Sequence, residues 1–452
     1  MAASHDSVAE QIRASSHAVI KVAVADIDGI LRGKYLQKEK LLGALDSGFG
    51  FCNVVFGWDS ADACYDNATY TGWHTGYPDA VVRLDPSTLR RIPWEQDTPF
   101  LLGEFEDGQG GPLLICPRQI LKRVLRRAET LGYVPKCGVE YEWFNFKETP
   151  QTLAAKGHAS PEPISPGMFG YSLLRSSLNQ PYVAALLENL RGFGVPLEGL
   201  HTETGPGVYE AAIAYSDALE AADRATLFKT AVKEIAYRHG IMPSFMAKWN
   251  AKLPGCGGHI HLSLWDGERN AFYDDGDAAR MSPVYRSFLA GQLRCLPELL
   301  PLFAPTVNSY KRLVDGYWSP TKPTWGIDNR TCAFRVIPGS ATSTRVEVRI
   351  GGADFNPYLA VAAAIATGVY GIEQRLELTD KPISGSAYQD GTIPRLPRNL
   401  QEATDRLAGS AVARELFGDA FVDHFVRTRR WEWSQYQDAV TDWELKRYFE
   451  II

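Results

Sequence analysis

Four strand-like segments of the sequence carry chemically active side chains at every second residue. Because successive side chains of a strand point to opposite faces, each segment presents one charged or polar face and one apolar face. The charged and polar faces carry Glu140 and Glu142; His259, His261 and Ser263; Arg345, Glu347 and Arg349; and Glu203 and Glu210 on either side of a Gly205-Pro206-Gly207 turn. That turn is able to bring its two carboxylates back toward one site.

A solvated sheet face over a hydrophobic interior is the simple alternative for any one of these segments. Two features weigh against it. The polar faces consist almost entirely of Glu, Arg and His, whereas a solvated face normally shows Lys, Thr and Ser. The opposite faces hold Val, Ile, Leu and aromatic residues, which fits a sheet covered by helices. If the four faces converge, five carboxylates and an imidazole lie close together, and such a cluster requires cations for stability.

The ligand types indicate which cations those are. Oxygen-rich ligands with a single His favour Mg²⁺ or Mn²⁺ over zinc, because the chain has no thiolate cluster and no His pair at zinc spacing. Further positive charge comes from a series of arginines: Arg312, Arg330, Arg335, Arg345 and Arg349. Metal ions with several arginines are what a transferring phosphoryl group requires. No G-x-x-x-x-G-K-[ST] loop is present, so we hypothesise metal-dependent phosphoryl chemistry outside the P-loop class.

The elements that must position these residues belong to a mixed fold. Residues 1–100 are β-rich, and the pair Asp28-Gly29 follows an apolar stretch where a hairpin turn would use it. Residues 86–117 are rich in proline and glycine without helical periodicity, and we interpret them as the junction between two domains. Apolar spacing then predicts three helices, at residues 117–131, 217–239 and 357–372, the last alanine-rich and buried.

Composition excludes several functional classes. A chain of 452 residues is long enough for two domains or one large one, and 45% hydrophobic with 22% charged residues excludes wholesale disorder. The formal net charge of −6 gives no reason to expect a nucleic-acid or anionic-membrane partner. The most apolar run, residues 358–372, is too short to span a bilayer, and residues 1–17 do not read as a secretory signal. Seven cysteines without a C-x-x-C pair favour reduced thiols, so a cytoplasmic enzyme is expected.

Taken together, the segments resemble the glutamine synthetase family, type I, over most of the chain. The motifs that carry this resemblance are Gly138-Val139-Glu140-Tyr141-Glu142-Trp143-Phe144, His201 to Glu210, Gly255 to Ser263, Asn308-Ser309-Tyr310-Lys311-Arg312-Leu313-Val314, Asn329-Arg330 through Pro338, Arg345 to Arg349, and Asn356-Pro357-Tyr358-Leu359. The resemblance implies an α+β fold with a small β-grasp-like N-terminal domain at residues 1–110. Residues 111–452 would form a large catalytic α/β domain with a curved antiparallel sheet. It also implies a homo-oligomeric ring, a dodecamer, with active sites between neighbouring subunits.

Roles follow for the positions that match the family's motifs. The resemblance implies one divalent metal, Mg²⁺ or Mn²⁺, held by Glu142, Glu203 and Glu210, and another held by Glu140, His259 and Glu347. It implies glutamate binding by Gly255, Arg312 and Arg349, contact of Arg330, Arg335 and Arg345 with the ATP phosphates, and contact of Ser263 with the nucleotide. In the implied reaction ATP phosphorylates the γ-carboxylate of glutamate, and an amine then displaces phosphate. Phosphorylation turns a poor leaving group into a good one.

The site for the attacking nitrogen departs from the family pattern. True glutamine synthetases read G-Y-E-A-P where this chain reads Gly316-Tyr317-Trp318-Ser319-Pro320, so Trp318 replaces the carboxylate that helps to bind and deprotonate ammonium. The family's D-G-S-S segment is also missing, and Asp59 is its nearest equivalent. Asp79 matches the other ammonium-side acid, which makes both aspartates catalytic candidates. Pro254 stands where the family usually has Asn.

Trp318 has two interpretations. It is either a packing aromatic in a loop that has drifted, or part of an altered amine site. Ammonium requires carboxylates, whereas an aromatic ring binds a cation weakly and cannot act as a base. A ring does suit a bulky or apolar amine, and an arylamine is mostly neutral at pH 7. The chain is therefore similar to γ-glutamylanilide and γ-glutamylalkylamide synthetases. We hypothesise an ATP-dependent ligase that joins glutamate to an organic amine, aromatic or bulky and apolar.

Two alternatives stay open: an ordinary glutamine synthetase using ammonia, and a catalytically silent structural ring. The filled metal-ligand positions argue against the silent ring. The surroundings of Tyr388 do not match the adenylylation loop of some type I members, so we expect no such regulation.

Overall fold

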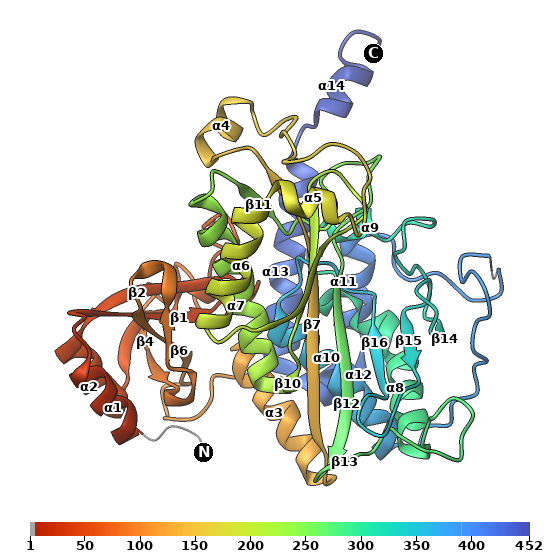
Figure 1. The fold of residues 1–452 in the computed structure, drawn as a ribbon, viewed down its shortest axis with the longest axis horizontal. Coiled ribbons are helices and arrows are strands. Elements are labelled where there is room, and N and C mark those ends of the chain that lie inside the picture. The colour runs from red at the N-terminus through yellow and green to blue at the C-terminus, as the bar shows by residue number, and fades with distance from the viewer. Residues whose placement is uncertain (1–4, 390) are drawn as a thin grey trace.

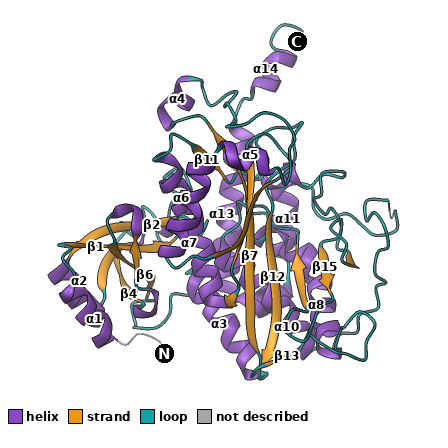
Figure 2. Cartoon of the chain, viewed as in Figure 1, coloured by secondary structure: helices purple, strands orange, loops and turns teal. Residues whose placement is uncertain are grey.

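The structure, a computed structural model, describes residues 5–389 and 391–452, which form two sheets with helices packed around them (Figures 1 and 2). The N-terminal sheet has six strands in the order β2-β1-β6-β4-β3, with β5 beside β6. Its pairings are antiparallel except for β1 with β6. The elements of this part are α1 (His5–Ala14), β1 (Val19–Ala25), β2 (Leu31–Gln37), α2 (Lys38–Ser47), β3 (Phe49–Cys52), η1 (Asn53–Phe56), β4 (Asp79–Leu84), η2 (Pro86–Thr88), β5 (Arg90–Ile92), η3 (Pro93–Glu95) and β6 (Thr98–Phe105).

The hairpin predicted around Asp28-Gly29 is confirmed. Strands β1 and β2 pair antiparallel on either side of it, and Gly29 has the positive φ of 77° that such a turn uses. The side chain of Asp26 fixes the turn, because its Oδ1 accepts hydrogen bonds from the backbone N–H groups of Asp28 (3.0 Å) and Ile30 (2.9 Å).

The interpretation of residues 86–117 as a domain junction is wrong for much of its length. This range contains β5 and β6, and β6 is a central strand that pairs with β1, β4 and β5. Seven of the eight residues of β6 are buried. A strand buried on both faces has no polar alternation, and its periodicity therefore gives no strand signal.

The second sheet has ten strands in the order β14-β15-β16-β12-β7-β9-β8, with β10 and β11 beside β7 and β13 beside β12. It is antiparallel except for the pair β14–β15. Figure 1 shows its long strands β7 and β12 side by side through the centre of the molecule. Its strands are β7 (Val134–Phe146), β8 (Leu197–Thr202), β9 (Val208–Ile213), β10 (Ser216–Asp217), β11 (Met242–Ser244), β12 (Gly258–Asp266), β13 (Arg269–Asn270), β14 (Trp325–Ile327), β15 (Phe334–Ile337) and β16 (Arg345–Val348).

Helices surround this sheet, and the three helices predicted from apolar spacing are confirmed as α3, α7 and α10. The helices of this part are α3 (Pro117–Thr130), α4 (Pro150–Ala155), α5 (Leu173–Leu178), α6 (Gln180–Gly192), α7 (Ala218–Tyr237), α8 (Pro283–Leu299), η4 (Leu300–Leu302), α9 (Ser309–Arg312), α10 (Pro357–Glu373), α11 (Leu400–Ala408), α12 (Ala411–Phe417), α13 (Asp419–Asp438) and α14 (Asp442–Tyr448). The alanine-rich α10 is buried, as expected, and packs against α3, α7 and α8.

The apolar face of β7 shows how the sheet is held by this layer. Tyr141 and Trp143 are fully buried, and their ring centroids lie 5.9 and 5.5 Å from that of Phe228 on α7. With this face packed on helices, the alternate residues of β7 face the other side.

In the described ranges, no helix is both long and apolar enough to cross a membrane. The division at residue 110 stays a prediction.

Candidate active site

The register of the second sheet aligns the four polar faces that the sequence singles out. Glu140 on β7 is the cross-strand partner of His259 on β12. On the far side of β12, His261 pairs with Glu347 on β16, and Glu347 also pairs with Arg335 on β15. On the other side of β7, Glu142 pairs with Glu210 on β9. The faces therefore converge, and a solvated face is excluded because Glu347 is only 1% exposed and His259 only 4% exposed.

Among the described residues, three groups of side chains at this site have the geometry to hold a metal ion, with ligand atoms within 4.8 Å of one another. They are Glu140, His259 and Glu347; Glu142, Glu210 and His259; and His201, Glu203 and Glu210. The first group is the complete set implied for one metal. The implied set of Glu142, Glu203 and Glu210 is divided between the other two groups. Carboxylate oxygens with an occasional imidazole suit hard divalent cations, so the donor set fits the implied metal.

The charges of the carboxylates also fit cation binding. Burial, reinforced by the neighbouring Glu142 and Glu140, raises the pKa of Glu210 to about 10. Burial also acts to raise the pKa of Glu347, but Arg349 and His261 lower it to about 2. The end of the cluster near β9 therefore has less compensating positive charge than the end near β16, where arginine offsets the charge of Glu347. A divalent cation between Glu142 and Glu210 would relieve the repulsion at the β9 end.

A cavity of about 590 Å³ opens beside the cluster. Its wall contains all six implied metal ligands and most of the implied glutamate and phosphate residues. The lining residues are Glu140, Glu142, Tyr171, His201, Glu203, Thr204, Glu210, Pro254, Gly255, His259, Arg312, Tyr317, Trp318, Arg330, Arg335, Glu347 and Arg349. One chain thus brings four of the predicted arginines and the carboxylates to a single hollow.

Three of the four arginines of this cavity are held by carbonyl and carboxylate oxygens. Arg312 Nη1 donates to the carbonyl oxygen of Ile350 (3.1 Å), and Arg349 Nε donates to that of Arg330 (3.1 Å). Arg335 Nη1 donates to Glu347 (2.8 Å), which also accepts from Arg349. Buried or half-buried guanidinium groups in fixed positions are suited to bind carboxylate or phosphate oxygens.

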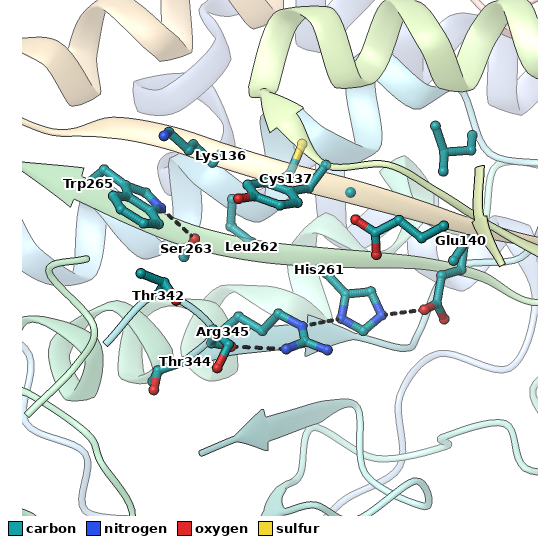
Figure 3. Close-up of a pocket in the computed structure, with 16 residues that line it drawn as sticks. Lys136, Cys137, Glu140, His261, Leu262, Ser263, Trp265, Thr342, Thr344 and Arg345 are labelled. Carbon is teal, nitrogen blue, oxygen red and sulfur yellow. Dashed lines mark hydrogen bonds and ion pairs between the residues drawn. The ribbon is translucent and has the colours of Figure 1, made fainter. Parts of the chain in front are cut away.

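A second cavity of about 250 Å³ lies along β12 and contains the other two predicted nucleotide residues, Ser263 and Arg345 (Figure 3). Ser263 Oγ accepts a hydrogen bond from Trp265 Nε1 (2.9 Å), and Lys136 Nζ lies 4.2 Å from the centroid of the Trp265 ring. A hydroxyl, a lysine and an aromatic ring in one hollow are suitable contacts for a nucleoside phosphate.

His261, to which the sequence assigned no role, joins the two cavities. Its Nδ1 accepts from Arg345 Nε (3.0 Å), and its Nε2 lies 3.0 Å from Glu140 Oε1, as Figure 3 shows. Glu140 lines both cavities. The imidazole therefore couples a predicted phosphate-binding arginine to a predicted metal ligand.

Two more residues of the larger cavity were missed. His201 lies 3.8 Å from Glu203 and 3.7 Å from Glu210, and Tyr171 stacks on its ring with centroids 4.4 Å apart. His201 stands two residues before Glu203, so the alternation that drew attention to the glutamates was also a signal for the histidine. Tyr171 comes from the loop before α5 and shows no pattern in the sequence.

Neither Asp59 nor Asp79 is among the described residues that line either cavity of their own chain. Asp59 accepts hydrogen bonds from the backbone of Ala61 (2.9 Å) and from Trp431 Nε1 of α13 (2.9 Å). Asp79 is exposed at the start of β4. Their catalytic assignment stays a prediction.

Trp318 lines the cavity with its side chain 59% exposed. Its φ of 59° is in the left-handed region, which is unfavourable for a bulky residue. An indole packed into its own chain would be buried, so the packing interpretation does not describe this residue within one chain. Strained backbone of this kind is concentrated at functional sites.

Tyr388 lies in the loop between α10 and α11. Its hydroxyl is buried and has no hydrogen-bond partner within the described part of the chain. The expected absence of adenylylation stays a prediction.

Comparisons with known proteins identify the family to which the chain belongs. Residues 114–448 match the family described as glutamine synthetase, catalytic domain. A relative from Dictyostelium discoideum, named type-1 glutamine synthetase 2, is 54% identical over 99% of this chain and 86% of its own length. A Pseudomonas protein named glutamate–isopropylamine ligase is 38% identical over 96% of this chain and 95% of its own length.

A solved structure described as a GmaS/ADP complex matches with a TM-score of 0.85 and 30% identity. The match covers 98% of this chain and 99% of that structure. The family match, the two relatives and the solved fold agree with the converged carboxylate and arginine site. The chain belongs to the glutamine synthetase family and is an ATP-dependent ligase that forms carbon–nitrogen bonds.

Proposed function

We propose that the protein joins the γ-carboxylate of glutamate to an organic amine, either aromatic or bulky and apolar, through a γ-glutamyl phosphate formed from ATP. The observation that carries this proposal is Trp318 on the wall of the larger cavity, which is also lined by the carboxylates and four of the arginines. The residues implied for phosphoryl transfer would then all be present, while an indole would stand in place of the carboxylate that serves ammonium.

The two cavities suggest where the substrates bind. Ser263 and Arg345 in the smaller cavity support a nucleotide site, and the ADP named for the similar solved structure agrees with this. Gly255, Arg312 and Arg349 in the larger cavity support a glutamate site. The γ-phosphate would reach the γ-carboxylate near Glu140, because this residue borders both cavities.

Mg²⁺ or Mn²⁺ would be held by Glu140, His259 and Glu347 on one side and by Glu142, Glu203 and Glu210 on the other. When bound, such ions polarise phosphoryl oxygens and offset their charge. The chain's own contribution is positional. Arg330 and Arg335 would stabilise charge on the transferring phosphoryl group, because both line the cavity beside Glu347.

The amine would arrive past Tyr317 and Trp318. An indole that is 59% exposed offers stacking area to an aromatic or bulky amine. A neutral arylamine has a free lone pair and needs no base before it attacks. The name of the Pseudomonas relative supports an organic amine as nucleophile.

Ordinary glutamine synthesis is the second candidate, favoured by the name of the Dictyostelium relative at 54% identity. In that case Asp59 and Asp79 would serve ammonium. Both lie away from the cavities of their own chain, so they would have to act in the site of a neighbouring subunit. This supports the proposed homo-oligomeric ring, a dodecamer, built from a β-grasp-like domain (1–110) and a catalytic domain (111–452). The cytoplasmic location stays a prediction.

A panel of amines with glutamate, ATP and Mg²⁺ tests the proposal, with ADP release and γ-glutamyl amide formation as readouts. We expect aniline or a bulky alkylamine to give the highest kcat/KM. Ammonia outperforming every organic amine would replace the proposal with glutamine synthesis. Absence of turnover with any nitrogen source would favour a silent ring. Glu347→Ala serves as the background control.

A further inference from the structure

Lys248, in the loop between β11 and β12, contacts two segments that contribute residues to the larger cavity. Its side chain is buried, with the residue 6% exposed. The ammonium donates to the carbonyl oxygen of Leu253, in the loop that leads to the cavity residues Pro254 and Gly255. The same Nζ lies 4.0 Å from the centroid of the Tyr317 ring.

The backbone of Lys248 is fixed from both sides by one residue. Its N–H donates to Asn308 Oδ1 (2.8 Å), and its carbonyl oxygen accepts from Asn308 Nδ2 (2.9 Å). The lysine therefore cannot shift without breaking a paired contact. Its position against the Tyr317 ring is built into the fold.

Tyr317 contacts this cation with its ring and is also part of the cavity wall. Tyr317 and Trp318 both line the cavity, whereas Lys248 is not among the described residues that do. The quadrupole of an aromatic ring attracts cations to its faces. A cation already bound at one face therefore weakens the attraction of the ring for a second cation at the other face. Burial and the nearby Arg312 lower the pKa of Lys248.

The consequence for the incoming nitrogen depends on its charge. A protonated amine gains little from a ring whose electron density already faces an ammonium. A neutral arylamine binds by stacking and burial of apolar area, which the rear cation does not oppose. The arrangement therefore discriminates between charged and neutral amines at the step of binding.

We propose that Lys248 is a specificity-determining residue for the amine, acting through Tyr317 to favour neutral amines over protonated ones. This inference rests on the proposed function, because it concerns the same amine entrance. Beyond the proposed function, it assigns a role to a residue on a separate loop and gives a physical reason why the enzyme would select amines by their charge.

The test is the ratio of kcat/KM for aniline, neutral at pH 7, to kcat/KM for ethylamine, protonated at pH 7. Lys248→Met removes the charge and should lower this ratio about tenfold, the size of one cation–π interaction. Lys248→Arg keeps a cation over the ring and should restore most of the ratio. Lys248→Gln keeps a donor for the Leu253 carbonyl without the charge and should behave as Lys248→Met, which covers the case that methionine impairs folding.

Lys311→Met is the matched control, because Lys311 Nζ lies 5.4 Å from the Tyr436 ring and Lys311 does not line the cavity. It should leave the ratio unchanged. In a Tyr317→Leu background, Lys248→Met should have no further effect on the ratio, since the ring that transmits the charge is gone.

An unchanged ratio in both Lys248→Met and Lys248→Gln would overturn the inference, and so would a change confined to the KM for glutamate. The latter would assign Lys248 to the glutamate loop alone. The proposed function is tested separately, with the unaltered protein. If that protein prefers ammonia to both organic amines, the proposed function fails. The effect of Lys248 on the aniline-to-ethylamine ratio is measured in the variants.

Discussion

Glu142 of β7 and Glu210 of β9 are direct cross-strand partners in the second sheet. Like charges placed opposite each other destabilise a sheet. Burial and the neighbouring Glu142 and Glu140 raise the pKa of Glu210 to about 10, which expresses this repulsion. A cation bound by the metal set proposed for Glu142 and Glu210 would offset this repulsion.

The first prediction concerns this pair. In the presence of EDTA near neutral pH, Glu210→Gln should be more stable than the unaltered protein, by on the order of 1 kcal/mol. The raised pKa of Glu210 means that the unaltered chain must take up a proton on folding, whereas glutamine is neutral in both states. Mg²⁺ should raise the Tm of the unaltered protein and raise that of the variant much less. Thermal denaturation with and without Mg²⁺ measures both. A variant that is less stable in EDTA and equally stabilised by Mg²⁺ would contradict the metal assignment.

The second prediction concerns Trp318. Trp318→Glu restores the carboxylate found in the family's ammonium site, so the kcat/KM for ammonia should rise while that for aniline falls about tenfold or more. Trp318→Phe keeps a ring and should retain the preference for aniline. Equal effects of Glu and Phe on both amines would mean that the indole does not face the nucleophile.

The third prediction concerns Glu347, which lies between Arg335, Arg349 and His259. Glu347→Gln keeps the shape and removes the charge, so kcat should fall roughly 10²- to 10³-fold, as when one electrostatic partner of a transition state is removed. Glu415→Gln, at an exposed ion pair with Arg127, should keep activity near that of the unaltered protein. Circular dichroism verifies folding. Near-normal kcat in Glu347→Gln would remove this residue from the proposed mechanism.

The fourth prediction concerns pH and the buried His424 of α13. Burial, together with Arg429 and Arg427, lowers the pKa of His424 from 6.5 to about 4. Its ring nitrogens have no hydrogen-bond partner in the described ranges, and Phe56 lies 6.4 Å away. Below pH 6.5 the unfolded chain binds a proton that the folded chain refuses, so stability present above pH 6.5 is lost as the pH falls toward 4.

The loss attributable to His424 should be on the order of 3 kcal/mol. Urea denaturation of His424→Leu between pH 7 and 4 should show a flatter dependence of unfolding free energy than the unaltered protein. His5→Gln, at an exposed histidine, should leave the dependence unchanged. Parallel curves for His424→Leu and the unaltered protein would show that this histidine takes up its proton without unfolding.

The sequence allowed much of this site to be predicted because strands impose a period of two. Glu140, His259 and Glu347 each lie on the polar face of an alternating segment, and they form one compact group in the structure. Helix α3 was equally predictable, because its apolar residues recur at helical spacing on one side. Strand β6 was missed because burial on both faces removes the alternation on which such predictions depend.

Contacts that depend on register or on distant segments could not be predicted. The pairing of β8 and β9 shifts between Leu197 and Gly199, and that shift decides that His201 lies opposite Glu210. The contact of Lys248 with Tyr317 joins two loops far apart in the chain. The role proposed for Asp59 would require a neighbouring subunit, which no pattern within one chain describes.

The most direct measurement is a competition reaction in which glutamate, ATP and Mg²⁺ meet equal concentrations of ammonium and aniline, with the products separated by mass spectrometry. If Trp318 and Tyr317 select a neutral aromatic nucleophile, γ-glutamylanilide will exceed glutamine. If glutamine is the dominant product, the indole does not determine the nucleophile, and the protein makes glutamine with the same carboxylates and arginines.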